Sequence, residues 1–555
     1  MRVSMRLTTI ILLIAMGLTG LSLSTTSHVA AQAAPVQYIL VGSGGSLPAN
    51  LDALVASVGG QLVGELDEIG VAIAQSADPN FVNAMASVSG LQGVAADRPI
   101  ALALPGQGDT TVVESLDGTS APPTTVDTTN LDLTSIDLSS LDATSEAIAP
   151  GGINPAQAKF FLAQWNLRDI GAPATWSAGF MGSSSVKVAV VDTGIDYTQQ
   201  ELVGQVDMTL SRSFFTEPLP KGAAPFLDVH GHGTHIAGII AAKGLSVAGV
   251  APRVTLLAIK VAGRSGFATY ASIIAAIKYA ADVGANIINM SFGDDLAKGG
   301  RDNALLMAAL NNAVNYAYGK GALLVASAGN SGIDWDRRIC ETHDALGNLI
   351  VLNCPTGKIP SNLTLWNAMK VPAQLPHVLA VSATGPQFQL SMKAMGVVPN
   401  GANPEQIYSD HGMSIINFAA PGGSVTPFRC LPVFASATGP MIACNLLPPL
   451  LNGNPDPNGM AADSILSACA RFTPFPPGKP NCTSGRANIF MVGTSMAAAH
   501  VSGAAALVDS AAGGMLTPDQ ITQMLMQSAD QFGQPGKDPW YGYGRINVYR
   551  AVTGN

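Results

Sequence analysis

The sequence carries few charged residues, because only 12% of its 555 residues are Asp, Glu, Lys or Arg. Hydrophobic residues make up 47%, so the chain can bury large apolar faces, which excludes a wholly disordered protein. The net charge is −9 and no run of Lys and Arg forms a basic patch, so we expect no nucleic-acid partner. The length exceeds that of one ordinary domain and is typical of a large globular enzyme with additional segments.

Basic residues are absent between Arg98 and Lys159, whereas eight of the 37 acidic residues lie there. Thr, Ser, Asp and Gly dominate this stretch, and a five-residue near-repeat runs over residues 131–145. Such a composition is typical of a solvated, low-complexity segment. We therefore predict an acidic linker over residues 105–158, with a short added β-element as the alternative.

Long hydrophobic runs are also missing. One apolar run, Ile10–Leu18, follows Arg2 and Arg6 and precedes an Ala-x-Ala sequence at residues 31–33. The run is shorter than a bilayer span requires, and no later segment is long and apolar enough. This arrangement predicts a signal peptide over residues 1–33, and therefore a secreted, extracellular protein without a membrane anchor. An uncleaved anchor is the alternative.

Cysteine is absent from the first 339 residues, and the six that follow form no Cys-x-x-Cys pair. This spacing argues against zinc binding and thiol redox chemistry. Because a secreted chain is oxidised, we expect disulfides, for which fifteen pairings are possible. The members of successive pairs are separated by 14, 14 and 13 positions, which favours three local bridges: Cys340–Cys354, Cys430–Cys444 and Cys469–Cys482.

Residues 34–104 alternate between strand-like and helix-like patterns. The β-α-β-β-α-β order predicts a small ferredoxin-like α+β domain in which two helices cover one face of a sheet. The predicted strands are residues 37–41, 61–66, 71–75 and 94–104, and the predicted helices are residues 49–58 and 78–88.

From Lys159 onward, near-continuous apolar runs alternate with helical stretches. This pattern predicts an α/β fold over residues 159–555, a three-layer, doubly wound, mostly parallel sheet with helices on both faces. Functional residues are expected at the carboxyl ends of its strands. The predicted strands are residues 186–191, 255–261, 285–289, 322–327 and 377–382, and the predicted helices are residues 235–242, 270–283, 303–318 and 496–510.

Three motifs carry candidate catalytic side chains. Asp192 ends a predicted strand, while His232 and Ser495 each lie between glycines and an apolar helix. Taken singly, an Asp after a strand or a Ser before a helix is usually a turn or cap residue. Together they meet one chemical demand, because a serine hydroxyl needs a base to take its proton, and that base needs an acid to orient it.

Residues 159–555 resemble the subtilisin-like family of serine proteases (peptidase S8). The resemblance implies that Asp192 orients His232, that His232 is the general base and acid, and that Ser495 is the nucleophile. It also implies that Asn330 donates its side-chain amide to the oxyanion. The motifs that carry the resemblance are residues 188–196, 232–238, 288–291, 328–330 and 493–498.

The same resemblance implies a substrate cleft for proteins or peptides. Lys370 is expected at the floor of the pocket for the residue before the scissile bond, where it would favour an acidic side chain unless Asp294 or Asp295 neutralises it. The implied edge strand over residues 263–270 pairs with the substrate backbone. The implied substrate-binding residues are Gly263, Ser265, Gly266, Ser291, Phe292, Gly293, Ala326, Ser327, Ala328 and Lys370.

Residues 34–104 resemble the family's inhibitor-like propeptide. The resemblance implies a zymogen in which the last residues, Ala101 to Leu104, lie in the cleft like a product. Self-cleavage is then expected near Leu104 or within the linker. The chain's own propeptide is thus an expected partner, and the mature enzyme is expected to be a monomer.

Two features depart from compact relatives. Residues 241–247 lack the carboxylate and Asn ligands of the family's strong calcium loop, so we expect no calcium there and no required cofactor. Structural calcium elsewhere, with unspecified ligands, stays open. Insertions over residues 331–371 and 423–492 hold the cysteines. They either restrict the access of large substrates to the cleft or are surface insertions that disulfides hold together.

Two other functions compete with this one. His230, His232 and His235 form a cluster that zinc could occupy in a metal hydrolase, although no carboxylate follows them and Ser495 would have no role. We predict no metal site. The second competing function is that of a non-catalytic scaffold or binding protein, and the presence of a full candidate triad argues against it.

Overall fold

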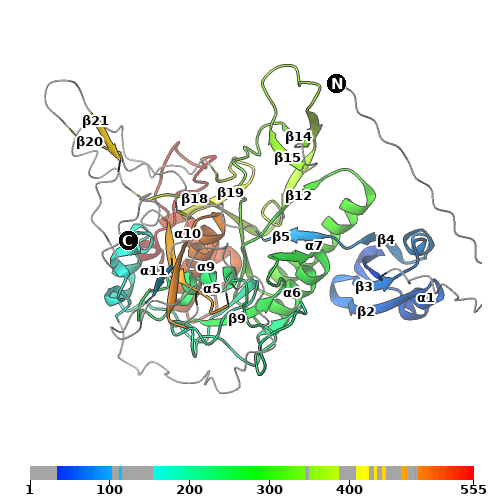
Figure 1. Cartoon of the computed structure of the whole chain (residues 1–555), viewed down its shortest axis with the longest axis horizontal. Helices are drawn as coiled ribbons and strands as arrows, with labels where there is room; N and C mark the ends of the chain where they lie inside the picture. The colour runs from blue at the N-terminus through cyan, green and yellow to red at the C-terminus, as the bar shows by residue number, and fades with distance from the viewer. Residues whose placement is uncertain are drawn as a thin grey trace, which may run out of the picture.

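The computed structural model describes residues 34–102, 112–114, 154–343, 349–386, 408–423, 430–433, 441–444, 464–472, 482 and 485–554. These residues form an N-terminal unit (residues 34–102) and a main unit (residue 154 onward) that pack against each other (Figure 1). The predicted signal peptide, residues 1–33, lies outside the described residues. Among the described helices, none has both the length and the apolar character that crossing a bilayer requires.

The N-terminal unit is an antiparallel sheet in the order β2-β3-β1-β4, as the predicted α+β domain requires. Tyr38 and Leu40 of β1 face α1 and α2 in a small core of their own. Ile39 and Val41 point to the opposite face and join the core of the main unit, because successive side chains of a strand alternate. The elements are β1 (Val36–Gly42), α1 (Leu51–Ser57), β2 (Gly60–Leu66), β3 (Val71–Ser76), α2 (Phe81–Met85) and β4 (Leu91–Ala96).

The predicted strand over residues 94–104 is wrong as a single element, because β4 ends before Asp97. The Asp97 carboxylate accepts a hydrogen bond from the Ala271 N–H (3.1 Å) at the start of α6 (Tyr270–Asp282), and this contact draws the chain away from its own sheet. The following β5 (Pro99–Ala101) pairs antiparallel with β10 (Phe267–Thr269) of the main unit. The last strand of the N-terminal unit therefore belongs to a sheet that it forms with the main unit.

The main unit is built on a seven-stranded parallel sheet in the order β19-β18-β13-β11-β7-β9-β8, which confirms the predicted α/β class. Val188 and Val190 of β7 face one core, whereas Ala189 and Val191 face the other. Because both faces are buried, these strands are apolar without alternation. The strands are β7 (Lys187–Asp192), β8 (Arg212–Ser213), β9 (Thr255–Lys260), β11 (Ile287–Met290), β13 (Leu323–Ser327), β18 (Val378–Thr384) and β19 (Ile416–Pro421).

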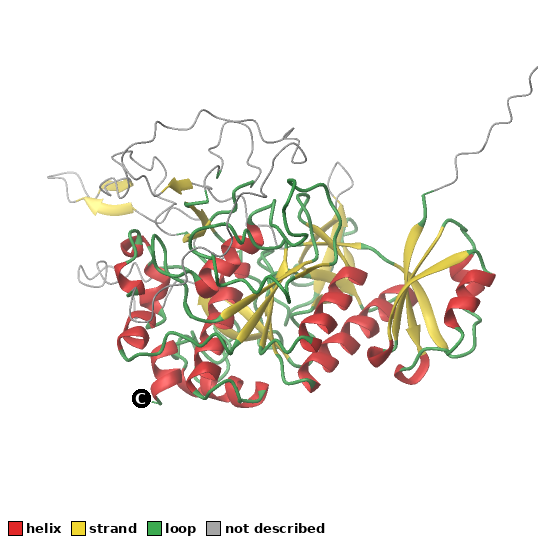
Figure 2. Ribbon diagram, turned by 90° about the horizontal axis from the view of Figure 1, so that it is seen from below, coloured by secondary structure: helices red, strands yellow, loops and turns green. Residues whose placement is uncertain are grey.

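Helices cover both faces of this sheet (Figure 2). Helices α5 and α9 pack on one face, and α6 and α7 pack on the other, where they also meet the N-terminal unit. The helices are α3 (Trp165–Asp169), α4 (Ala172–Ser177), α5 (His232–Ala241), α6 (Tyr270–Asp282), α7 (Arg301–Gly319), α9 (Thr494–Ala511), α10 (Pro518–Ser528) and α11 (Val548–Thr553).

The predicted insertions carry small antiparallel elements. Two of the predicted disulfides are present: Cys340–Cys354, which joins β14 to the residue after β15, and Cys469–Cys482, which lies between β22 and β23. The third pair faces across the β20–β21 ladder, but its side chains lie outside the described residues. The strands are β12 (Asp294–Ala297), β14 (Ile339–His343), β15 (Leu349–Asn353), β16 (Thr364–Trp366), β17 (Ala368–Val371), β20 (Cys430–Val433), β21 (Met441–Cys444), β22 (Ile465–Ala468) and β23 (Ala487–Met491).

Part of the predicted linker is a strand. β6 (Val112–Glu114) pairs antiparallel with β23 and extends the β22–β23 sheet, as the alternative of an added β-element proposed. The main unit begins at Asn154, whose side chain caps a short helical turn, slightly before the predicted boundary at residue 159. The remaining residues between 103 and 153 lie outside the described part of the chain.

Candidate active site

Asp192 and His232 meet at the carboxyl end of the sheet. Asp192 is the last residue of β7, and His232 is the first residue of α5, three positions before the predicted helix start. The Nδ1 atom of His232 lies 2.9 Å from Oδ1 and 3.0 Å from Oδ2 of Asp192. Both side chains are buried, so the pair is shielded from water.

The chain before α5 is shaped so that His232 can reach Asp192. Gly231 has a φ of 104°, a left-handed conformation that glycine adopts without strain. A Cβ atom on Gly233 would lie 2.2 Å from the Gly194 carbonyl oxygen, so the helix and the loop after β7 touch through backbone alone. The glycines of the motif are therefore needed for the close approach of the two catalytic candidates.

The pKa of His232 is raised by this arrangement. Burial by itself lowers the pKa, since it disfavours the charged imidazolium. The negative charge of Asp192 and its hydrogen bond outweigh burial, and Asp228 adds to the effect. The imidazole is thus a stronger base than an ordinary histidine.

Ser495 is the second residue of α9, buried beside the end of β11. Its Oγ donates to the carbonyl oxygen of Ser291 at 3.3 Å, and Ser291 Oγ donates to the carbonyl oxygen of Ser495 at 3.0 Å. Within the described part of the chain, Nε2 of His232 makes no hydrogen bond. The Asp–His hydrogen bond of the predicted triad is formed in this structure, and the Ser–His hydrogen bond is not.

Asn330 lies against the turn that precedes Ser495. Its Oδ1 accepts hydrogen bonds from both the backbone N–H and the hydroxyl of Thr494, each at 2.9 Å. This leaves Nδ2 on the other side of the amide, 3.3 Å from where a Cβ of Gly493 would stand. The amide donor therefore has a fixed orientation next to the first turn of α9, whose own N–H groups point toward the same end.

The last residues of the N-terminal unit lie between two segments of the predicted cleft. The Leu102 N–H donates to the Gly266 carbonyl oxygen at 2.9 Å, and Leu102 forms an antiparallel bridge with Phe292 on its other side. Phe215 and Glu217 fill the space that a side chain at Gly263 would occupy. The segment therefore occupies the position of a central strand between two edges.

Ala326, Ser327 and Ala328 are buried at the end of β13, and the Ser327 hydroxyl lies 3.5 Å from the Phe292 carbonyl oxygen. The two predicted walls of the pocket are therefore adjacent. Ser265 lies in the turn between Gly263 and Gly266, whose backbones are joined by a 3.0 Å hydrogen bond.

Lys370 is buried beneath these walls. A Cβ on Gly293 would lie 3.3 Å from its Cδ, and one on Gly329 would lie 2.9 Å from its Cε. The ammonium group pairs with Asp295 and, at 3.3 Å, with Asp410. Asp295 therefore neutralises Lys370, and Asp410 adds a second carboxylate. The pocket is then not expected to favour an acidic substrate side chain.

The three histidines of the alternative metal site do not converge. Nε2 of His235 lies 3.1 Å from the carbonyl oxygens of Ile465 and Ile489, and burial lowers the pKa of His235 to about 3. The Nδ1 of His230 faces the backbone N–H of His232. In the regions that the structure describes, no three His, Cys, Asp or Glu side chains are grouped as metal ligands.

The loop after α5 is organised around Glu201, a residue that the sequence motifs did not reveal. Its carboxylate accepts hydrogen bonds from the N–H groups of Gly244, Leu245 and Ser246 and from the Ser246 hydroxyl. A calcium loop directs oxygen atoms at a cation, whereas this loop directs N–H groups at an anion. These residues do not fit calcium.

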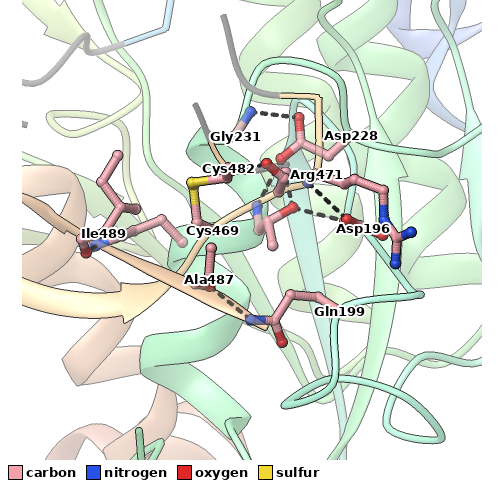
Figure 3. The surroundings of a disulfide bond; sticks show 12 residues. Asp196, Gln199, Asp228, Gly231, Cys469, Arg471, Cys482, Ala487 and Ile489 are labelled. Atoms are coloured by element: carbon pink, nitrogen blue, oxygen red, sulfur yellow. Dashed lines mark hydrogen bonds between the residues drawn. A yellow bond between two sulfur atoms is a disulfide. The ribbon is translucent and has the colours of Figure 1, made fainter. Parts of the chain in front are cut away.

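The Cys469–Cys482 loop is anchored to the segments that hold Asp192 and His232 (Figure 3). The Arg471 N–H donates to Asp196 at 2.9 Å, and the Asp196 N–H donates to the Thr234 hydroxyl of α5 at 2.9 Å. This insertion is thus connected through hydrogen bonds to the loop that follows Asp192 and to the first turn of α5, which holds His232.

Known proteins resemble this chain in both sequence and fold. The model described as the subtilase family matches residues 183–544. The thermophilic serine proteinase of Bacillus sp. (strain AK1) is 29% identical over 375 residues, which are 67% of this chain and 63% of that protein. Thermitase of Thermoactinomyces vulgaris is 35% identical over 188 residues, which are 32% of this chain and 58% of that protein. The matched part therefore spans less than two thirds of these relatives.

One solved structure covers nearly the whole chain. The crystal structure of the epidermin leader peptide processing serine protease from Staphylococcus aureus matches with a TM-score of 0.62 and 21% identity. The match covers 94% of this chain and 99% of that chain. At this identity the likeness concerns the fold alone.

Proposed function

Because this chain belongs to the subtilase family, as its motifs predicted, we propose that it is a secreted serine endopeptidase made as a propeptide-inhibited zymogen. Its substrates are proteins or peptides. The observation that carries this proposal is the buried Asp192–His232 hydrogen bond at the carboxyl end of the sheet. Ser495 lies in the first turn of α9, the helix that packs on α5. A non-catalytic scaffold would have no use for a buried carboxylate held against an imidazole, because burial of a carboxylate is costly.

The proposed reaction begins with a rotation of the Ser495 side chain, away from the Ser291 carbonyl oxygen and toward Nε2 of His232. The hydroxyl oxygen attacks the substrate carbonyl carbon while its proton passes to Nε2, and Asp192 stabilises the imidazolium. The Asn330 amide and the Ser495 N–H then donate to the oxyanion. His232 returns the proton to the leaving amine, and water hydrolyses the acyl-enzyme by the same route.

The proposed propeptide is residues 34–102 and the few residues that follow. Its strand β5 and Leu102 hold the backbone positions beside Gly266 and Phe292 that a substrate would take. Its sheet shares one hydrophobic core with α6 and α7. A propeptide that inhibits by occupying the cleft, and that is removed by self-cleavage soon after Leu102, accounts for the strand in the substrate position and for the shared core.

The decisive experiment is labelling of the secreted protein with a fluorophosphonate, followed by mass spectrometry. We expect one label, on Ser495, and a mature N-terminus soon after Leu102. Ser495→Ala should abolish the label, whereas Ser502→Ala, a change to a buried serine on the same helix, should keep it. Loss of activity with a chelator but no labelling would favour the metal hydrolase instead.

Asn330→Ala is expected to lower kcat by about 10²–10³-fold with little change in KM. The reason is that the amide would donate only when the oxyanion forms, so its loss affects the transition state and not substrate binding. Steady-state kinetics on a peptide substrate would measure this. An equal loss in Asn330→Asp and Asn330→Ala would agree with a missing donor, whereas unchanged kcat in Asn330→Ala would exclude the role.

A further inference from the structure

We propose that Asp294, Tyr270 and Asn303 form a subsite for a basic side chain of the substrate, which Arg98 of the propeptide occupies in the precursor. This inference rests on the proposed peptidase function, because it treats the propeptide strand as a stand-in for substrate. It names a specificity site at a distance from the catalytic residues.

The guanidinium of Arg98 is held by three elements of the main unit. Its Nη2 lies 2.6 Å from Oδ2 of Asp294 on β12, and its Nη1 lies 3.1 Å from Oδ1 of Asn303 in the first turn of α7. The Tyr270 ring lies beneath it, with the ring centroid 5.4 Å from Cζ. A carboxylate, an amide oxygen and an aromatic face together match the charge, the donors and the plane of a guanidinium.

The main unit supplies this subsite without help from Arg98. Tyr270 belongs to α6 of the main unit, and its hydroxyl donates to Oδ2 of Asp294 at 2.9 Å. The carboxylate therefore stays oriented after the propeptide leaves. Among the described residues, Arg98 is the cation that pairs with Asp294, whereas the neighbouring Asp295 is paired with Lys370 of the main unit. Release of the propeptide thus leaves one oriented carboxylate without its cation.

The backbone register fixes where a substrate would present its basic residue. The Tyr270 N–H donates to the Arg98 carbonyl oxygen at 3.3 Å, β5 then pairs with β10, and Leu102 lies opposite Phe292. A substrate in the same antiparallel register places at Asp294 the residue four positions before the one opposite Phe292. Arg or Lys at that position would gain a charge-assisted hydrogen bond.

The expected gain is moderate, because the Arg98 and Asp294 side chains keep 36% and 28% of their exposure. Exposed ion pairs contribute little, whereas hydrogen bonds to charged groups contribute more. We therefore expect kcat/KM to be about 5–20-fold higher for a peptide with Arg than for one with its neutral isostere citrulline. Glu at that position should be worse than citrulline.

The test uses the mature wild-type enzyme and quenched fluorescent peptides with the sequence of residues 95–108, carrying Arg, Lys, citrulline or Glu in place of Arg98. Asp294→Asn should remove the preference for Arg over citrulline, measured as the ratio of the kcat/KM values of the two peptides with the same variant. Asp302→Asn is the matched control. Asp302 is an exposed carboxylate in the same first turn of α7 as Asn303, so this variant should leave the preference intact. Asn303→Ala provides a second variant, with a smaller loss.

Two outcomes would overturn the inference, and they differ from failure of the proposed function. If the wild-type enzyme cleaves the Arg and citrulline peptides with equal efficiency, the subsite does not exist. If the preference persists in Asp294→Asn, another group causes it. If the enzyme cleaves no peptide and takes no fluorophosphonate label, the peptidase assignment fails, and the subsite fails with it.

Discussion

Ser495→Ala is expected to accumulate as a precursor that retains residues 34–102 and to lose about 10⁶-fold in kcat. Without the hydroxyl no acyl-enzyme forms, so the bond after the propeptide strand stays intact. The strand then continues to block the cleft beside Gly266 and Phe292. Mass spectrometry of the purified protein would report the N-terminus, and a peptide assay would report the activity.

The purified variant must be kept free of active enzyme, because a wild-type molecule would cleave it in trans. Addition of a trace of wild-type enzyme is therefore the positive control, and it should restore cleavage. A Ser495→Ala protein that matured in isolation would contradict self-processing. Full activity in that protein would contradict the whole catalytic assignment.

Asp192→Asn is expected to lower kcat by about 10⁴-fold although the fold is kept. Both carboxylate oxygens face Nδ1 of His232, so an amide in their place presents an N–H donor and favours the wrong tautomer of the imidazole. Stopped-assay kinetics at a pH well above 7 would measure the loss. A fall in thermal stability large enough to explain it would point to unfolding instead.

The pH profile separates a catalytic from a structural role of Asp192. The neutral form of His232 is the base, so activity is lost as the pH falls through its pKa. The raised pKa of His232 places this loss above pH 6.5 in the wild-type enzyme. Removal of the Asp192 charge takes away the main effect that opposes burial and leaves the weaker effect of Asp228, so the pKa of His232 falls and the residual activity should persist to lower pH. A shift in the opposite direction would contradict the assignment.

The sequence motifs named Asp192, His232 and Ser495, and the hydrogen bond between Asp192 and His232 is present in the structure. The helix boundaries around these residues were not predicted closely. The predicted helices begin three and two residues later than α5 and α9 do. The positive φ values of Gly231 and Gly493 let each helix start directly at the motif. The strands were predicted more closely, because burial on both faces leaves a continuous apolar run.

By itself, the sequence determined the family, the order of the main strands and helices and the identity of the catalytic candidates, because each of these is written in a few adjacent residues. Only the tertiary structure decided which partner each charged side chain has: Glu201 accepts from the N–H groups of residues 244–246, Lys370 pairs with Asp295 and Asp410, and Arg98 pairs with Asp294. Arg98 and Asp294 are 196 positions apart. Such pairs leave no local pattern, since their partners are chosen by how the sheets and helices pack and not by neighbours in the chain.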